Sequence, residues 1–201
     1  MKLEKISKNL SYILRHNPSS IDLTLDKNGW ADVKSLLKQL SQYGKELSMT
    51  ELEWIVDNNN KKRFAFNDKK TKIRASQGHS IDIDLNLEEK IPPQLLYHGT
   101  STDTIAKIHK GGLKKMSRQH VHLSADKETA FNVGKRHGES CVFIVESEKM
   151  LQYGYKFYES ENGVWLTDNV PAEFIVGIYY SGYFDSLNIL DFKNAKYEVL
   201  Y

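Results

Sequence analysis

The sequence predicts an α+β protein made of two lobes. Apolar residues recur at helical spacing through roughly the first third of the chain, and short apolar strands dominate the part after residue 94. An acidic segment that ends in Pro92-Pro93 separates these parts. Many short strands with few helices are typical of a domain built around a mixed or split sheet. We therefore place an N-terminal lobe at residues 1–80, a linker at 81–93 and a C-terminal lobe at 94–201.

Three apolar stripes predict three helices in the N-terminal lobe. Asn17-Pro18 ends the first helix, because proline disfavours helical geometry at the residue before it. Thr50 and Glu53 predict a capping box at the start of the third helix. The stripes, with apolar residues three or four positions apart, are Leu3, Ile6, Leu10, Ile13 and Leu14; Val33, Leu36, Leu37 and Leu40; and Leu52, Ile55 and Val56.

A β-hairpin follows the helices. Phe64 and Phe66 alternate with other residues, and Ile73 comes after the polar turn 67–70, which predicts two short strands. Three helices and a hairpin make a winged-helix arrangement. Such modules often bind nucleic acid, although they also serve in protein–protein contacts.

Charge is concentrated on this hairpin. The net charge of the chain is only +2 and predicts neither a nucleic-acid nor a membrane partner. Between residues 60 and 80, however, seven basic residues face a single acid, Asp68, which is enough to hold several phosphates. The alternative is a solvated run of charge. The basic residues are Lys61, Lys62, Arg63, Lys69, Lys70, Lys72 and Arg74.

The C-terminal lobe is expected to contain seven short strands and two helices. Ser101 or Thr102 predicts the cap of a helix that carries Ile105 and ends at Gly111-Gly112. A second helix is expected from Asp126 to Arg136. The expected strands are 95–98, 121–123, 142–146, 156–158, 164–166, 174–180 and 197–201.

Several classes of protein are disfavoured. The single cysteine, Cys141, lies in an apolar run and is expected to be a buried thiol, so neither a disulfide framework nor a cysteine metal site is predicted. The N-terminus has no apolar signal-like stretch and no run of about 20 apolar residues occurs, so we expect a cytoplasmic protein without a membrane partner. Dinucleotide-binding, P-loop and nucleophile-elbow motifs are absent.

Two short segments carry residues suited to chemistry. Arg15-His16 ends the first helix, where a basic pair also simply favours the helix dipole. The segment 97–101 delivers His98 from an apolar strand to Gly99, whose missing side chain lets a ligand approach, followed by hydroxyls at a helix start that favour anions. The alternative for His98 is a turn with a satisfied histidine.

Histidines also raise the question of a metal. His120 and His122 share one face of a strand, and with His98 and His137 they make a zinc site conceivable. No H-E-x-x-H motif or cysteine ligand accompanies them, so no metal is expected.

Eight segments, in order along the chain, resemble the RNA 2′-phosphotransferase family (KptA-type enzymes). They are Leu10–Pro18 (LSYILRHNP), Asn28–Trp30 (NGW), Lys62–Phe64 (KRF), Ile73–Ser80 (IRASQGHS), Leu96–Ser101 (LYHGTS), His122–Ser124 (HLS), Gly134–Gly138 (GKRHG) and Val164–Thr167 (VWLT). The resemblance implies a winged-helix lobe followed by a lobe like that of ADP-ribosyltransferases, with NAD bound on the second lobe and RNA against the basic hairpin.

The resemblance also implies the site residues. The catalytic set Arg-His-Arg-Arg corresponds to Arg15, His16, Arg63 and Arg136, with Arg15 and Arg63 gripping phosphate and His16 and Arg136 acting in a second step. Val164 stands where toxin-like relatives carry a glutamate, which agrees with a phosphate that needs no activating base. The residues expected to contact NAD are His98, Gly99, Thr100, Ser101, His122 and Ser124.

The implied reaction moves an internal, splice-junction 2′-phosphate from RNA to NAD. Its products are RNA with a 2′-hydroxyl, ADP-ribose 1″,2″-cyclic phosphate and nicotinamide, and the enzyme is expected to be a monomer. Two alternatives stay open. One is an ADP-ribosyltransferase that modifies terminal phosphates of RNA or DNA. The other is a winged-helix RNA-binding protein without catalysis.

Overall fold

The computed structural model describes residues 2–59, 62–180 and 189–191, so the strand expected at 197–201 lies outside the described residues. The chain divides into two compact units. Unit 1 comprises residues 1–87 together with two short segments of the second half, 117–119 and 160–162. Unit 2 comprises residues 88–116, 120–159 and the chain from residue 163. The fold is α+β, as predicted.

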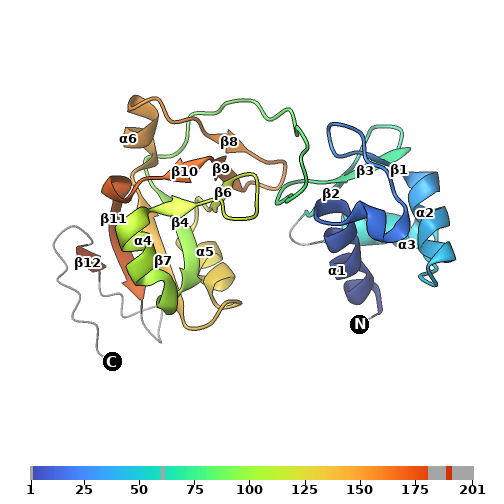
Figure 1. The fold of residues 1–201 in the computed structure, drawn as a ribbon, viewed down its shortest axis with the longest axis horizontal. Coiled ribbons are helices and arrows are strands. Elements are labelled where there is room, and N and C mark those ends of the chain that lie inside the picture. The colour runs from blue at the N-terminus through green and yellow to red at the C-terminus, as the bar shows by residue number, and fades with distance from the viewer. Residues whose placement is uncertain (1, 60–61, 181–188, 192–201) are drawn as a thin grey trace. The chain divides into compact units, whose positions relative to one another are not determined.

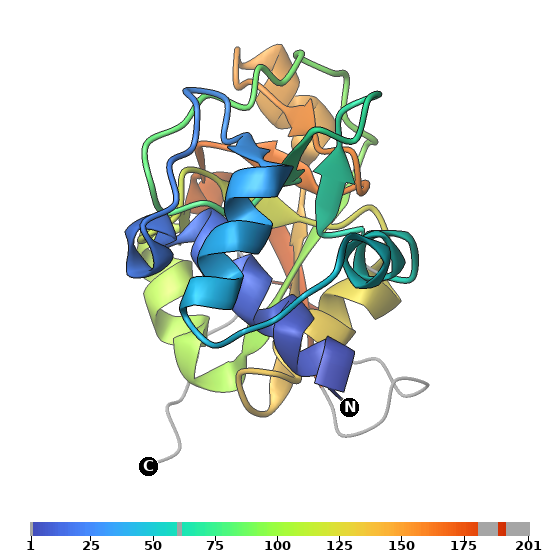
Figure 2. The same ribbon diagram turned by 90° about the vertical axis from the view of Figure 1, so that its right-hand side faces the viewer.

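Unit 1 packs three helices against a small antiparallel sheet (Figures 1 and 2). The helices are α1 (Lys2–Arg15), α2 (Val33–Gln42) and α3 (Met49–Asp57), and a 3₁₀ turn, η1 (Pro18–Ile21), follows α1. The strands β1 (Ala31–Asp32), β2 (Phe64–Phe66) and β3 (Lys72–Ala75) pair in the order β1-β3-β2. The predicted helices and hairpin are confirmed. β1 was not predicted, since two residues are too few to show an alternating pattern.

The helix ends of unit 1 explain where its elements stop. α1 ends at Arg15, where the N–H groups of His16 and Asn17 both donate to the carbonyl of Tyr12, at 2.9 and 3.2 Å. The capping box of α3 is formed by Ser48 and Glu51, so its prediction from Thr50 and Glu53 is wrong. Ser48 has the extended backbone that a cap requires, whereas Thr50 already lies inside the first helical turn.

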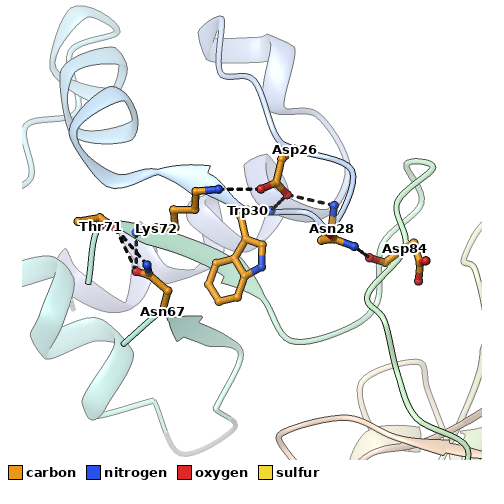
Figure 3. A network of polar contacts seen from close by, with 7 residues as sticks. All are labelled: Asp26, Asn28, Trp30, Asn67, Thr71, Lys72 and Asp84. Atoms are coloured by element: carbon orange, nitrogen blue, oxygen red, sulfur yellow. Dashed lines mark hydrogen bonds and ion pairs between the residues drawn. The ribbon is translucent and has the colours of Figure 1, made fainter. Parts of the chain in front are cut away.

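Hydrogen bonds connect the Asn28-Gly29-Trp30 segment to neighbouring parts of unit 1 (Figure 3). Asp26 accepts hydrogen bonds of 3.0 Å from the backbone N–H groups of Asn28 and Trp30, and it pairs with Lys72 at 3.0 Å. The side chain of Asn28 donates to the carbonyl of Asp84 at 2.7 Å. This contact holds residues 81–87, the first part of the expected linker, within unit 1.

Unit 2 is built on three antiparallel sheets (Figure 1). The four-stranded sheet has the order β12-β11-β7-β4, the three-stranded sheet β6-β9-β8 and the two-stranded sheet β10-β5. Tyr97 and Ser124 exchange two backbone hydrogen bonds of 2.8 Å, which link β4 to the chain just after β6. The strands are β4 (Leu96–Ser101), β5 (Leu113–Lys114), β6 (Val121–Leu123), β7 (Ser140–Val145), β8 (Tyr158–Glu159), β9 (Trp165–Thr167), β10 (Asn169–Val170), β11 (Ile175–Tyr180) and β12 (Ile189–Asp191).

Three helices accompany these sheets: α4 (Ile105–Gly111), α5 (Lys127–Gly134) and α6 (Ser147–Gln152), with the 3₁₀ turns η2 (Thr102–Thr104) and η3 (Ala172–Phe174). The expected helix at 126–136 is confirmed as α5, which Asp126 caps. The expected cap of α4 by Ser101 or Thr102 is wrong. β4 continues through Gly99 to Ser101, and the N-cap of α4 is Thr104, whose hydroxyl donates to the Ser101 carbonyl at 2.7 Å.

Cys141 is fully buried in the core of unit 2, as expected, and burial raises the pKa of its thiol to about 12. A thiol with such a pKa is chemically inert near neutral pH. Among the helices that the structure describes, none is both long enough and apolar enough to cross a membrane.

Candidate functional site

The end of α1 carries a group of positively charged side chains in unit 1. Arg15, its last residue, lies against Gly78, since a Cβ atom placed on Gly78 would be 3.6 Å from the Nη1 atom of Arg15. Gly78 has a φ of +88°, which favours glycine, so this close backbone turn depends on the residue type. The charges of Arg63 and Arg118 both act on Arg15.

Arg15 is suited to an anion that the structure does not itself supply. Burial, and to a smaller extent the nearby charges of Arg63 and Arg118, lower the pKa of its guanidinium to about 10. Its Nε and Nη2 atoms are buried, and neither has a hydrogen-bond partner among the described residues. The guanidinium nonetheless stays charged at neutral pH. Buried polar atoms in native proteins almost always have partners, so these two donors point to a ligand.

Arg118 was not recognised in the sequence. It lies in the segment 117–119, which belongs to unit 1 although its neighbours on both sides belong to unit 2. The next residue fastens this segment: the backbone N–H of Gln119 donates to the His79 carbonyl at 3.1 Å, and its side chain donates to the Ile83 carbonyl at 2.7 Å. No motif of the sequence separates Arg118 from an ordinary surface arginine, because the hydrogen bonds that place its segment join Gln119 to residues some 40 positions earlier.

His16 stands next to this group of arginines. Its Nδ1 atom lies 2.9 Å from the hydroxyl oxygen of Ser80. Burial lowers the pKa of His16, and the charges of Arg15 and Arg118 lower it further. His16 is therefore inclined to be neutral in the ligand-free protein. A bound dianion would act in the opposite direction and favour its protonated form.

His79 is a second histidine at this site and is only 1% exposed. Burial first, and then the charges of Arg15, His16 and Arg74, lower its pKa to about 3. Neither ring nitrogen has a partner among the described residues. A neutral imidazole thus lies buried beside a charged guanidinium without neutralising it.

Within unit 1 the structure brings together the predicted catalytic residues Arg15, His16 and Arg63 and adds Arg118. The side chain of Arg63 also donates to Asn59 at 3.3 Å. Arg136 belongs to unit 2, where it is exposed just after the end of α5. Within the described part of the chain, no carboxylate forms an ion pair with any of these arginines.

The residues predicted to contact NAD lie on β4 and β6 of unit 2 and just after β6. Side chains alternate along a strand, so His98 and Thr100 lie on one face of β4 and Gly99 and Ser101 on the other. A Cβ on Gly99 would be 1.6 Å from the carbonyl oxygen of Ala130 in α5, and the Ser101 hydroxyl donates to Asp103. The space expected for a ligand at Gly99 is therefore filled by a helix. The hydroxyls of Thr100 and Ser101 lie in β4, and Ser101 directly precedes η2 without a side-chain cap hydrogen bond.

The other face of β4 is joined to β6. The Nδ1 atom of His98 lies 2.9 Å from the carbonyl oxygen of His122. Thr100 and Ser124 are half-buried. Over residues 2–59, 62–180 and 189–191, no three histidine, cysteine, aspartate or glutamate side chains gather closely enough to hold a metal ion.

The basic run of the hairpin is less available than its sequence indicates. Lys70 pairs with Glu53 at 2.8 Å and Lys72 with Asp26 at 3.0 Å. Arg74 pairs with Glu161 at 2.6 Å and also lies 4.5 Å from the ring centre of Trp30. These acids come from other parts of unit 1, so counting charges along residues 60–80 overstated the local excess.

Known proteins match the chain over most of its length. The family described as "RNA 2′-phosphotransferase, Tpt1 / KptA family" matches residues 1–169. A protein of Fusobacterium nucleatum named "Probable RNA 2′-phosphotransferase" is 56% identical over 172 residues, covering 85% of this chain and 96% of its own. Proteins with the same name from Flavobacterium johnsoniae and Burkholderia pseudomallei are 56% and 50% identical, covering 86% and 85% of this chain and 94% and 93% of theirs.

Proposed function

This chain belongs to the RNA 2′-phosphotransferase, Tpt1/KptA family, and on that premise we propose that it transfers an internal 2′-phosphate from RNA to NAD. The products of the proposed reaction are RNA with a free 2′-hydroxyl, ADP-ribose 1″,2″-cyclic phosphate and nicotinamide. An RNA with a 2′-phosphate at a splice junction, such as a spliced tRNA, is the proposed substrate.

One observation supports the phosphate site above all others: Arg15 is half-buried and charged, and two of its donor atoms are buried without partners, beside Arg63 and Arg118. A phosphate monoester is a dianion with oxygens that accept paired hydrogen bonds from guanidinium groups. It would satisfy the unpaired donors and offset the repulsion between the arginines. We assign the RNA 2′-phosphate to this place.

The positions of the three arginines and of His16 suggest a role for each of them. Arg15 and Arg63 grip the phosphate. Arg118 takes the role that was expected of Arg136, because its charge acts on both Arg15 and His16 within unit 1. It would stabilise charge on the phosphoryl oxygens while the bond to RNA breaks. His16 would give a proton to the departing 2′-oxygen of the RNA.

We assign the NAD site to unit 2. The half-buried hydroxyls of Thr100 and Ser124 and the imidazoles of His98 and His122 are suited to ribose hydroxyls and phosphate oxygens. Gly99 and Ser101 already contact α5 and Asp103, so they fit a supporting role in shaping β4. When bound, NAD supplies an anomeric carbon from which nicotinamide departs and a neighbouring hydroxyl that accepts the phosphate.

We also propose a finer fold for each unit. In unit 1 the order helix, strand, helix, helix, strand, strand supports a winged-helix module. In unit 2 two antiparallel sheets linked through Tyr97 and Ser124 support an ADP-ribosyltransferase-like lobe.

The proposal is tested by incubating the full chain with NAD and a short RNA that carries one internal 2′-phosphate. RNA and nicotinamide are followed in the same samples. Formation of both 2′-hydroxyl RNA and nicotinamide is the expected result. Nicotinamide release with NAD-derived label retained on the RNA would instead favour the ADP-ribosyltransferase alternative. RNA binding without either product would favour a binding protein.

A further inference from the structure

Ser80 holds both residues at the end of α1. Its hydroxyl oxygen lies 2.9 Å from the Nδ1 atom of His16, and its backbone N–H donates to the carbonyl of Arg15 at 3.0 Å. The preceding residue, His79, accepts the hydrogen bond that fastens the Arg118 segment. Residues 79 and 80 therefore contact the chain beside three of the proposed site residues, although Ser80 is separated from His16 by 64 positions in the sequence.

The partner of His16 at Nδ1 is a neutral hydroxyl and not a carboxylate. The charges that act on His16 are those of Arg15 and Arg118, and His16 in turn acts on the neutral His79; the ring of Tyr12 lies 6.0 Å away. Histidines in catalytic sites are often oriented by a carboxylate at Nδ1. A carboxylate here would repel the phosphate and neutralise the arginines. A hydroxyl orients the ring without adding charge.

We infer that Ser80 is a positioning residue that holds His16 as the Nδ1–H tautomer, so that Nε2 is the atom that carries the transferable proton. This inference rests on the proposed function. Ser80 accepts from Nδ1–H in both the neutral and the charged imidazole, so the ring keeps one orientation while Nε2 gains and loses its proton.

The step that uses this arrangement is the release of RNA. The oxygen of the acceptor ribose hydroxyl forms a bond to phosphorus and gives its proton to solvent. The bond from phosphorus to the RNA 2′-oxygen breaks with its electron pair on that oxygen. The 2′-oxygen takes the proton from Nε2 of His16, which returns to neutral imidazole. Ser80 contacts no reacting atom and acts only through His16.

The first test needs neither RNA nor NAD. Nitrogen chemical shifts of His16, assigned with a His16→Gln variant, report the tautomer in the full chain. We expect the Nδ1–H form to dominate in the wild type and in Ser80→Thr, which keeps the hydroxyl. Ser80→Ala should lower the ratio of Nδ1–H to Nε2–H at least threefold. Ser19→Ala removes another exposed serine hydroxyl bond near the same helix end and should leave the ratio unchanged. An unchanged ratio in Ser80→Ala would overturn the inference.

The second test follows turnover. Ser80→Ala should slow the appearance of 2′-hydroxyl RNA at least tenfold while nicotinamide release changes less than threefold, so that labelled RNA accumulates. Ser80→Thr should recover at least a third of the wild-type rate. Equal slowing of both products, with weaker RNA binding, would show a merely structural role and contradict the inference. If the wild type itself forms neither product, the proposed function fails, and the tautomer measurement still decides on Ser80.

Discussion

Two segments of similar composition behave differently in the two units. Gln77-Gly78-His79-Ser80 in unit 1 and His98-Gly99-Thr100-Ser101 in unit 2 each combine histidine, glycine and a hydroxyl residue. In the first, Gly78 lies against a charged side chain, and the two ring nitrogens of buried His79 have no partners among the described residues. In the second, Gly99 lies against the backbone of α5, and His98 contacts the backbone at His122.

The difference shows that one sequence pattern can meet two physical needs. The first segment leaves hydrogen-bonding capacity unused around Arg15, which is what a binding site requires. The second segment uses its glycine to bring a helix close to a strand. Variants that disturb packing should therefore act mainly through the second segment, and variants that disturb binding should act mainly through the first.

The largest effect is expected for Gly99→Ala. Its Cβ would be 1.6 Å from the Ala130 carbonyl oxygen, so α5 must move as a whole. We expect a loss of about 3 kcal/mol or more in the free energy of unfolding, measured by urea denaturation. Gly111→Ala is a matched control in unit 2, because its Cβ would meet only the flexible end of Lys114, at ordinary contact distances of 3.7 and 3.9 Å. Equal losses in the two variants would mean that α5 does not depend on Gly99.

Arg118→Ala and Arg136→Ala compare one arginine of unit 1 with one arginine of unit 2 as candidates for the fourth catalytic position. Arg118 acts on Arg15 and His16, so its removal should lower kcat/KM about 100-fold or more. Arg136 is exposed, as Arg118 is, but it is not among the charges that act on Arg15 or His16, so its removal should lower kcat/KM less than about tenfold. The reverse order of effects would return the fourth catalytic position to Arg136.

The burial of His79 predicts a dependence of stability on pH. Folded His79 has a pKa of about 3, so it stays neutral while an unfolded histidine takes up a proton below about 6.5. The contribution of neutral His79 to the free energy of unfolding is therefore fully present above pH 6.5, and it is lost as the pH falls toward 3. At pH 5 the loss should be about 2 kcal/mol relative to pH 7.5. Urea denaturation of His79→Leu at both pH values should show a smaller difference; an unchanged difference would assign it to other groups.

The smallest effect is expected for Gly78→Ala. Its Cβ would meet Arg15 at ordinary contact distances of 3.6 to 3.8 Å, so only the left-handed backbone, with a φ of +88°, is strained. A loss of about 1 kcal/mol in unfolding free energy is expected. A loss as large as that of Gly99→Ala would show that the two glycines serve the same purpose after all.

The helical stripes and the hairpin could be predicted because their signal is local. Helical spacing from Ile6 to Leu14 and alternation from Phe64 to Phe66 report burial within a few residues of each position. The short strands β5 and β10 escaped prediction, since two residues carry no period. The start of α4 was misplaced, because β4 keeps its pairing with β7 through Ser101.

The candidate site could be predicted only in part. Arg15 and His16 were found through resemblance, whereas Arg118 depends on the hydrogen bonds between Gln119 and distant carbonyls. The compensation of Lys70 and Lys72 by Glu53 and Asp26 was likewise invisible, since ion pairs join residues far apart in the sequence. Spacing describes neighbours along the chain, and charge acts between neighbours in space.

The assignment of residues 117–119 and 160–162 to unit 1 has a consequence for synthesis. A nascent chain emerges from the ribosome N-terminus first, so the three helices of unit 1 are available early. Arg118 reaches this unit only after residues 88–116 of unit 2 have been translated, and Glu161, the partner of Arg74, only after residues 120–159 have followed. Unit 1 is therefore begun first and completed late, and the arginines of the site are brought together only when the nascent chain has extended past residue 118.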